Sequence, residues 1–366
     1  MTDTPLEMDA QKRGSDYFPC PSCGANMYFD PDNANLKCQF CDHVLVFERE
    51  NGAIQEYDLS ELPEENQNWA EGALAIQCEN CGAKSAVGSE TMTKFCAYCG
   101  SSHIVNINEF TGIAPESLVP FTVSEKKARE SFQDWIRKRW LAPNALKKKN
   151  EAGRINGAYV PYWTYDADTY YSYTAMAGEH YYVTETRMEN GERKEVRVQK
   201  TRWYPVAGSG RQYFDDLQVS ATNKLTKGLV DSLEPFALEK LVPYQPEYLS
   251  GFQAERYSVD VKAGWEEAKA EINAHLHSLV RSSIHADEVR DINIFATYKD
   301  VAYKHFLVPV WLSSYLFKKK TYQVMINGEN GKVVGKFPVS FWKVLLLILG
   351  ILGFIALIVF IVMQFQ

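Results

Sequence analysis

The sequence predicts an α+β protein with two tandem four-cysteine zinc ribbons, a mixed α/β domain with antiparallel hairpins and one C-terminal transmembrane helix. Three observations predict this: eight cysteines in two matching sets, a tyrosine-rich middle that alternates strand-like and helix-like runs, and an uncharged run near the C-terminus. The chain has 366 residues, 46% of them hydrophobic, which is enough for one sizeable core and small modules.

The cysteines are the most specific signal. Each set holds two Cys-x-x-Cys pairs, and 14 residues separate the pairs in both sets. This spacing is typical of zinc ribbons. Four thiolates complete a tetrahedral site and leave no open coordination position, so a structural zinc ion is favoured over a catalytic one. The predicted ligands of two zinc ions are Cys20, Cys23, Cys38, Cys41, Cys78, Cys81, Cys96 and Cys99. A redox dithiol or a disulfide framework is the alternative, and two equal spacings in tandem favour zinc.

Two histidines, His43 and His103, follow the second cysteine pair of each set. Because each quartet of thiolates is already complete, we expect both histidines to lie outside the metal sites.

Composition divides the chain into consecutive segments. We expect disorder over 1–14, a first ribbon over 15–50, an acidic linker over 51–73, a second ribbon over 74–110, a basic linker helix over 111–150, a mixed α+β domain over 151–340 and a membrane anchor over 341–366.

Periodicity predicts the elements between the ribbons and the anchor. Ser124 is a plausible N-cap for a helix with an apolar stripe at Ala128, Phe132, Trp135, Ile136 and Trp140. Asn190-Gly191 lies between alternating runs and predicts a hairpin. Further expected elements are strands over 159–175 and 291–311, helices over 217–232 and 264–284, and a closing hairpin around 327–331.

A weak internal echo links the two long strands. Val160-Pro161-Tyr162-Trp163 is matched by Val308-Pro309-Val310-Trp311, and both are followed by tyrosine-containing strands. The similarity indicates either that one half of the domain is a duplicate of the other or that the same residues start two unrelated strands, and we favour duplication.

The run from Val344 to Met363 contains no charged residue. Its 20 residues span about 30 Å as a helix, the thickness of a bilayer core. Lysines precede this run and none follows it, so the positive-inside rule places the N-terminal part in the cytosol. The N-terminus shows no secretory signal, and the sequence therefore predicts a tail anchor.

Charge argues against nucleic-acid binding by the ribbons. Residues 15–110 contain four basic and fifteen acidic residues, a balance of −11, whereas phosphate binding needs clustered lysine and arginine. A protein partner, especially a basic one, fits better. Residues 124–150 carry nine basic and three acidic residues, which indicates either contact with anionic lipid headgroups or a solvated helix face.

No catalytic motif is present. The chain lacks a P-loop and an H-E-x-x-H motif, so the sequence predicts that the protein is not an enzyme. Asp166 with Asp168, and Asp215 with Asp216, are possible carboxylate sites, but solvated positions are the commoner interpretation. The aromatic residues of 159–173 are expected to fill a core, with a ligand groove as the alternative.

Several segments carry a family resemblance, namely APNALKKK, AYVPYWTYDADTYYSY, YFDDLQVSA, LEPFALEKLVPYQPEYLSGFQAERY, FLVPVWLSSY and INGENGKVVGKFPVSFWK. Together they resemble bacterial TFIIB-type zinc-ribbon membrane proteins, which are often labelled primosomal protein N′-like or replication factor Y helicases. The resemblance covers about 115–343, and the ribbons fit too. This chain lacks the ATPase motifs that a helicase requires. Some relatives are encoded beside phage-shock-protein-A-like and flotillin-like (SPFH) proteins and are thought to recruit them.

The resemblance implies an adaptor that recruits protein partners to the bacterial cytoplasmic (inner) membrane for envelope stress or membrane organisation. The residues alone predict a cytosol-facing, single-pass, zinc-stabilised binding protein, and they leave its oligomeric state open. Two alternatives remain: a nucleic-acid-binding replication or transcription factor, and an uncharacterised enzyme in the aromatic-rich domain.

Overall fold

The computed structural model describes residues 18–50, 52–62, 74–87, 96–99, 101–107, 112–144, 146, 155–189, 192–317 and 320–364. The segment expected to be disordered, 1–14, lies outside the described residues, as does about half of the expected acidic linker over 51–73.

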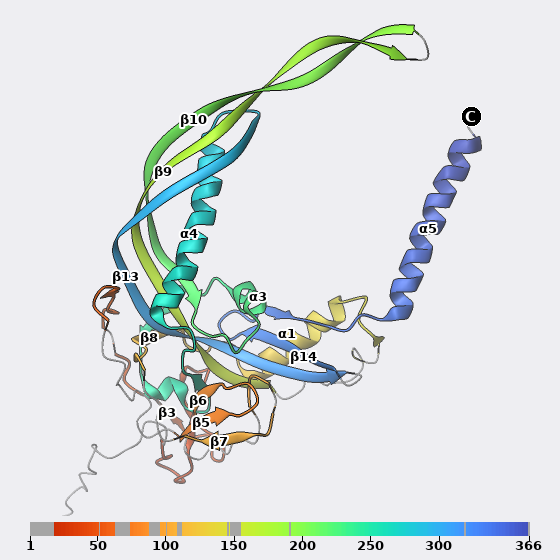
Figure 1. The fold of residues 1–366 in the computed structure, drawn as a ribbon. Coiled ribbons are helices and arrows are strands. Elements are labelled where there is room, and N and C mark those ends of the chain that lie inside the picture. Colours follow the sequence, from red (N-terminus) through yellow and green to blue (C-terminus); the bar gives the residue numbers. More distant parts are fainter. Residues whose placement is uncertain are drawn as a thin grey trace, which may run out of the picture.

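Three long strands form the backbone of a twelve-stranded sheet (Figure 1). They are β9 (Ile155–Glu189), β10 (Glu192–Ser220) and β13 (Glu288–Phe317). β9 pairs antiparallel with β10 on one side and with β13 on the other. The sheet is strongly curved, and α4 (Val261–Ser283) lies on its concave face.

β9 and β10 continue beyond the third strand as a two-stranded ribbon. The pairing of β13 with β9 begins at Glu288 and Gly178, whereas β9 and β10 stay paired as far as Glu189 and Glu192. We call residues 179–189 and 192–202 the arm. The predicted hairpin is therefore confirmed, although its two turn residues lie outside the described ranges.

Shorter strands complete the structure. The large sheet also contains β4 (Tyr57–Asp58), β5 (Leu74–Cys78), β6 (Lys84–Val87), β7 (Ile104–Asn106), β8 (Ser117–Leu118), β11 (Val242–Pro243), β12 (Gln253–Glu255), β14 (Lys320–Asn327) and β15 (Val333–Gly335). A separate three-stranded sheet contains β1 (Met27–Asp30), β2 (Asn35–Cys38) and β3 (Val44–Leu45). β14 and β15 pair antiparallel, which confirms the closing hairpin.

The aromatic residues at the start of β9 fill the core, as expected. Tyr159, Tyr162, Trp163 and Tyr165 are all buried. Adjacent strand residues point to opposite faces, and Tyr162 and Trp163 belong to different core clusters. The base of the sheet is therefore covered on both faces.

Helix α4 confirms the helix expected over 264–284. Asp260 caps its N-terminus by accepting a hydrogen bond from the Ala263 amide at 2.9 Å. Its buried side chains recur at helical spacing, and Ile272 and Leu276 pack with Ala167 of β9. The concave face is thus closed by one amphipathic helix.

Helix α1 (Glu125–Lys138) begins after Ser124 as expected, and four of the five predicted stripe residues are buried. The exception is Trp140, which is 56% exposed. The helix ends at Lys138, so Trp140 leaves the helical periodicity that the prediction assumed. The assignment of Trp140 to the buried stripe was wrong.

The helix expected over 217–232 was also wrong for its first part. β10 continues to Ser220, with Leu217 and Val219 in register with Tyr165 and Trp163. Within and just after this segment, helical structure is confined to α3 (Lys227–Val230) and a 3-10 turn (Asp231–Leu233). Pairing with β9 outweighed the local helical pattern.

The two echoed motifs lie side by side in the sheet. Val308 of β13 pairs with Val160 of β9 in antiparallel register. Val160 and Val308 share a core cluster, whereas Trp163 and Trp311 lie in two different clusters. The duplication of a half stays a prediction.

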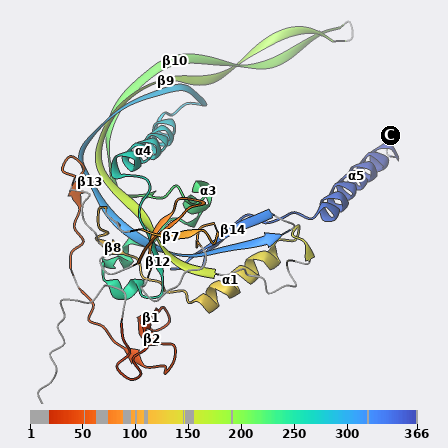
Figure 2. The same cartoon turned by 60° about the horizontal axis from the view of Figure 1, so that its bottom comes forward.

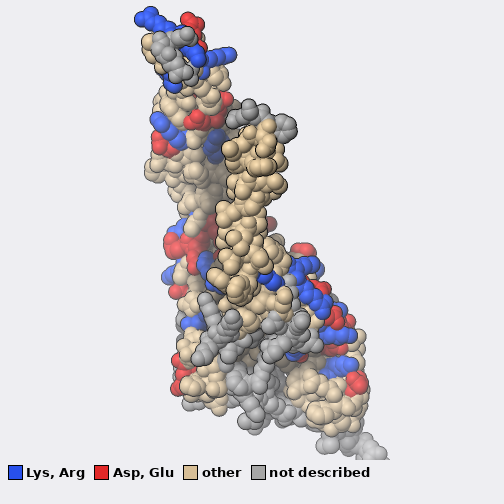
Figure 3. Space-filling view, turned by 90° about the vertical axis from the view of Figure 1, so that its right-hand side faces the viewer, with Lys and Arg blue, Asp and Glu red and all other residues tan. Residues whose placement is uncertain are grey.

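Helix α5 (Phe341–Gln364) is long and apolar enough to cross a membrane, and none of it is buried within the described chain. It starts beside the C-terminal end of α1, where the Lys343 ammonium donates to the Trp140 carbonyl at 2.9 Å and the Ala142 carbonyl at 2.8 Å. α5 and the arm extend to the same side of the body (Figures 1 and 3). In Figure 3 the surface of α5 beyond its first turn is free of charge, whereas the tip of the arm carries charges of both signs.

Candidate metal centres

The first four-cysteine unit, residues 18–50, brings two cysteine knuckles together. The Gly24 amide donates to the Cys20 carbonyl at 2.8 Å, and the Asp42 amide donates to the Cys38 carbonyl at 3.1 Å. Gly24 and Asp42 both have positive φ, at 75° and 57°. These tight turns point the two sulfurs of each knuckle to one side.

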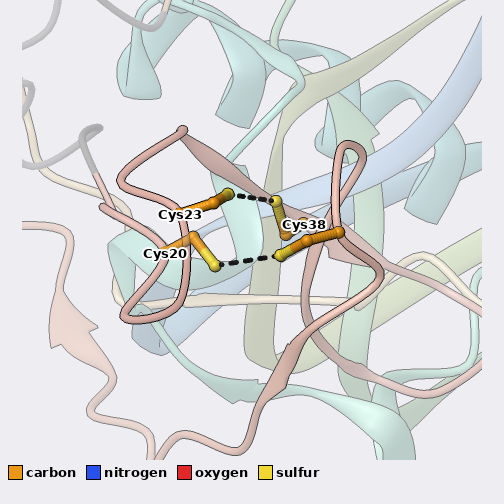
Figure 4. A group of neighbouring side chains, drawn as sticks. Cys20, Cys23 and Cys38 are labelled. Atoms are coloured by element: carbon orange, nitrogen blue, oxygen red, sulfur yellow. Dashed lines mark hydrogen bonds between the residues drawn. The ribbon is translucent and has the colours of Figure 1, made fainter.

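The four sulfurs of this unit form one group (Figure 4). The Sγ atoms of Cys20 and Cys41 lie 3.5 Å apart, and those of Cys23 and Cys38 also lie 3.5 Å apart. A tetrahedral ion with metal–sulfur bonds of about 2.3 Å would separate its sulfurs by roughly 3.8 Å. The donor set and its dimensions therefore fit a tetrahedral metal such as zinc.

The second four-cysteine unit comprises the described residues from 74 to 107. Its sulfur pairs, Cys78 with Cys99 and Cys81 with Cys96, are 3.6 and 3.7 Å apart. Gly82 has a φ of 71°, and its amide donates to the Cys78 carbonyl at 2.8 Å. The two units thus share one local design, and each group of four cysteines could hold a metal ion.

Backbone amides favour the thiolate form of Cys38. In the first unit the amides of Cys41 and Phe40 point at the Cys38 sulfur and lower its pKa to about 7. A lowered pKa makes the thiolate, which is the metal-binding form, available near neutral pH.

The two units differ in how they join the body. β6 of the second unit pairs with β12, which pairs with β9, so this unit continues the large sheet. The first unit has its own sheet and lies to one side (Figure 2). Each unit buries two cysteines in a core cluster of the body, Cys20 and Cys38 in one and Cys78 and Cys96 in another. The other two cysteines of the first unit, Cys23 and Cys41, are exposed, whereas those of the second unit are partly buried.

Neither neighbouring histidine belongs to the metal-ligand groups found among the described residues. The His43 ring lies 3.1 Å from the Ser22 hydroxyl, and the backbone amide of His103 donates to the Ser101 hydroxyl at 3.1 Å. Both contacts are local to the knuckles.

Asp166 and Asp168 are buried, so the expectation that they are solvated was wrong, whereas Asp215 is exposed. Asp166, Asp168 and Asp216 fall into two separate groups. Asp166 accepts from the Asp216 amide at 2.6 Å, and Lys304 bridges Asp216 at 2.6 Å and Glu56 at 2.8 Å. Asp168 pairs instead with Arg211 at 2.7 Å. Both groups lie beside bulges, where the register shifts in β10 after Phe214 and in β13 after Lys299.

Burial raises the pKa of Asp166 to about 7. Lys304 supplies a buried positive charge to the neighbouring carboxylates Glu56 and Asp216, which lie far apart in the sequence. This arrangement matches an internal ion-pair network that fastens residues 52–62 to the sheet. No local sequence signal could have found Glu56 or Lys304, because their pairing spans most of the chain.

Two cavities lie outside the segment 159–173, where the ligand groove was the alternative expectation. One of about 960 Å³ lies between the first four-cysteine unit and the start of α1 and is lined by Asp32, Lys126 and Phe252, among others. Another of about 840 Å³ lies between Cys99 and residues 335–339, which lead into α5. The first eight residues of the expected ligand groove, 159–166, are almost wholly buried.

The chain is similar to the protein named "Uncharacterized protein YdjG" of Bacillus subtilis (strain 168). The two are 29% identical over 342 residues, which cover 92% of this chain and 94% of that protein. No family model matches the chain, and no solved structure matches it.

Proposed function

We propose that this chain is a membrane-anchored adaptor, with two structural zinc ions that stabilise cytosolic protein-binding units. The observation that carries the proposal is α5, a 24-residue helix without buried residues that is joined directly to a body bearing two closed groups of four cysteines. A helix that is apolar on all sides and covered by no other part of the described chain is best explained by a bilayer.

The metal part of the proposal follows from the donor set. Four thiolates at tetrahedral separations suit zinc and leave no coordination position for substrate or water. In such sites the ion organises a small module that lacks a sufficient core of its own.

The membrane part has a consequence for the orientation of α5. A bilayer placed around α5 as it stands would also enclose the charged arm, which extends to the same side (Figure 3). Charged side chains such as those of Arg193 and Lys200 are costly inside a bilayer. Anchoring therefore requires α5 to turn about residues 336–340, which releases Lys343 from the end of α1.

The partner part rests on charge and on the resemblance described above. The acidic four-cysteine units attract basic surfaces and disfavour polyanions. Confinement to a membrane raises the local concentration of a soluble partner, which is the simplest benefit of an anchor. Phage-shock-protein-A-like and SPFH proteins are the first partners to test.

The test compares the wild-type chain with a Leu349→Arg, Ile355→Arg variant, and with a matched Leu349→Ala, Ile355→Ala control. We expect the arginine variant to leave the membrane fraction, because each arginine at the centre of a span costs about 3 kcal/mol or more. A genuine partner should leave the membrane with it, whereas the alanine control should retain both.

Retention of the arginine variant after high-salt and carbonate washes would refute the anchor. A partner distribution that ignores the variant would refute recruitment. Submicromolar, salt-resistant binding of the chain to DNA would instead support the nucleic-acid alternative.

A further inference from the structure

The first four-cysteine unit exposes a group of apolar side chains. Phe40 is 80% exposed and Val46 is 74% exposed, and Val44 and Leu45 between them are also exposed. We call these four residues the β3 patch, because β3 consists of Val44 and Leu45. Contiguous exposed apolar residues of this kind are typical of interaction sites.

The β3 patch lies on an open sheet edge. In the three-stranded sheet, β3 pairs with β2 through Leu45 and Leu36, and no other strand pairs with β3 in the part of the chain that the structure describes. The opposite edge is occupied, since the Phe29 amide donates to the Ser250 carbonyl at 3.0 Å. One edge of this sheet is therefore available to an added strand.

Fixed contacts flank the patch on its C-terminal side. Phe47 packs against Tyr248 with ring centroids 5.1 Å apart. The Glu50 amide donates to the Gln245 side chain at 3.3 Å, and the same side chain donates to the Glu48 carbonyl at 3.0 Å. The Cys38–Cys41 knuckle holds the other side. The open edge is thus presented by a fixed segment.

Charge selects the kind of partner. Residues 18–50 contain five acidic residues, Asp30, Asp32, Asp42, Glu48 and Glu50, and two basic residues, Lys37 and Arg49. Asp42 pairs with Lys37, and Asp32 pairs with Lys127 of α1. Four thiolates around one divalent ion would make this balance more negative. An apolar edge in a unit of net negative charge suits an extended segment whose apolar residues alternate with lysine or arginine.

The second four-cysteine unit offers a built-in comparison. Its terminal strand β7 also ends a sheet, and its one large exposed apolar side chain among the described residues is Val105, at 39%. The two units share the knuckle design, so the exposed apolar edge is particular to the first unit. That unit lies at the end of the body away from α5 (Figures 1 and 2).

We infer that the β3 edge binds an extended, basic and apolar segment of a partner protein by strand addition. This inference rests on the proposed adaptor function and names its docking surface. Backbone hydrogen bonds to β3 would supply part of the affinity, and contacts with Phe40 and Val46 would supply the rest.

The experiment uses the full chain in phosphatidylcholine nanodiscs and three labelled peptides of about 12 residues, long enough to add a strand to the edge. One alternates valine and lysine, one alternates valine and glutamate, and one is the lysine peptide with a central proline. We expect the lysine peptide to bind, the glutamate peptide not to bind, and the proline peptide to bind at least tenfold more weakly. Fluorescence anisotropy at two salt concentrations measures each case, and binding should weaken as salt rises.

Two matched variants locate the site. Val46→Lys places a charge in the β3 patch, next to the end of β3, and should weaken binding of the lysine peptide at least tenfold. Val105→Lys makes the same change on β7 and should change binding less than twofold. Phe40→Ser should also weaken binding, and zinc content with thermal unfolding verifies that all variants remain folded.

Several results would overturn the inference. They are absence of binding to the lysine peptide, equal binding of all three peptides, and equal loss in Val46→Lys and Val105→Lys. Dissociation of a wild-type oligomer by Val46→Lys would assign the edge to a second copy of the chain. The peptide assay does not depend on α5. Failure of the docking inference can therefore be distinguished from failure of the proposed membrane recruitment.

Discussion

Two buried side chains, Glu255 and His305, lie in the body with perturbed protonation. Glu255 is fully buried, and burial raises its pKa to about 8, although the Thr222 hydroxyl donates to it at 2.5 Å. Burial likewise lowers the pKa of His305 to about 4. Both groups are therefore expected to be mostly neutral near pH 7, at which a buried charge would be costly.

The two groups should give the stability of the chain opposite responses to pH. The folded state holds the Glu255 proton at pH values where an unfolded glutamate, with a pKa near 4.3, has lost it. The Glu255 contribution to the free energy of unfolding therefore falls as pH rises from about 4 to 8. His305 binds a proton more readily when unfolded, so its contribution falls as pH drops from about 6.5 towards 4.

We predict that Glu255→Gln removes the Glu255 contribution, which is the loss of stability as pH rises. The variant should gain stability over the wild type as pH rises, by an amount on the order of a few kcal/mol above pH 8. Urea unfolding between pH 5 and 9 measures the difference. Glu266→Gln, at an exposed position of α4, is the control and should follow the wild-type curve. An equal pH slope in the wild type and Glu255→Gln would contradict the prediction.

At the scale of elements, the close approach of α4 to β9 depends on a glycine. Gly264 is buried in the first turns of α4, over the aromatic rings of the sheet. A Cβ atom there would lie 2.9 Å from Cδ1 of Trp163 and would also clash with the Tyr165 hydroxyl. These two side chains donate hydrogen bonds to the Val259 and Val261 carbonyls at 3.0 and 2.6 Å, so displacing them loosens the start of α4.

Gly264→Ala should therefore destabilise the protein by about 1–3 kcal/mol, although alanine is the better helix former. The matched control is Gly228→Ala in α3, where an added Cβ meets no atom within 4 Å. That change should be neutral or stabilise by up to about 1 kcal/mol. Thermal and urea unfolding measure both. Equal effects of the two substitutions would show that α4 accommodates the extra methyl group.

For the whole molecule, the two four-cysteine units should differ in their effect on the body. Both units bury two cysteines in a core cluster with residues of the large sheet: Cys78 and Cys96 share one with Tyr162, and Cys20 and Cys38 share another with Tyr159. The units differ in backbone pairing, because β6 of the second unit continues the large sheet through β12, whereas the first unit has its own three-stranded sheet. Loss of metal from the second unit should therefore spread into the body more than loss from the first.

We predict that Cys20→Ser and Cys78→Ser each reduce bound zinc from two ions to one per chain. Since structural zinc contributes on the order of 10 kcal/mol to such modules, each change should unfold its own unit. The thermal transition of the body, followed by the fluorescence of the buried Trp163, should fall further in Cys78→Ser. Elemental analysis gives the zinc content. Equal falls in the two variants would contradict the coupling of the second unit to the sheet.

Local patterns were enough to predict the knuckles, the long hairpin, α4 and α5, because each depends on residues that are near one another in the chain. Cysteine spacing, Asn190-Gly191 and an uncharged run carry their structural meaning without distant contacts. Long-range contacts decided the remainder. Leu217 lies in a strand because β10 pairs with β9 there. Lys304 pairs with Glu56, which is far away in the sequence, and the second four-cysteine unit continues the large sheet through β12. Such pairings form only when segments that are distant in the sequence come together in the folded chain. Burial of apolar surface stabilises them in that state, so no local sequence pattern predicts them.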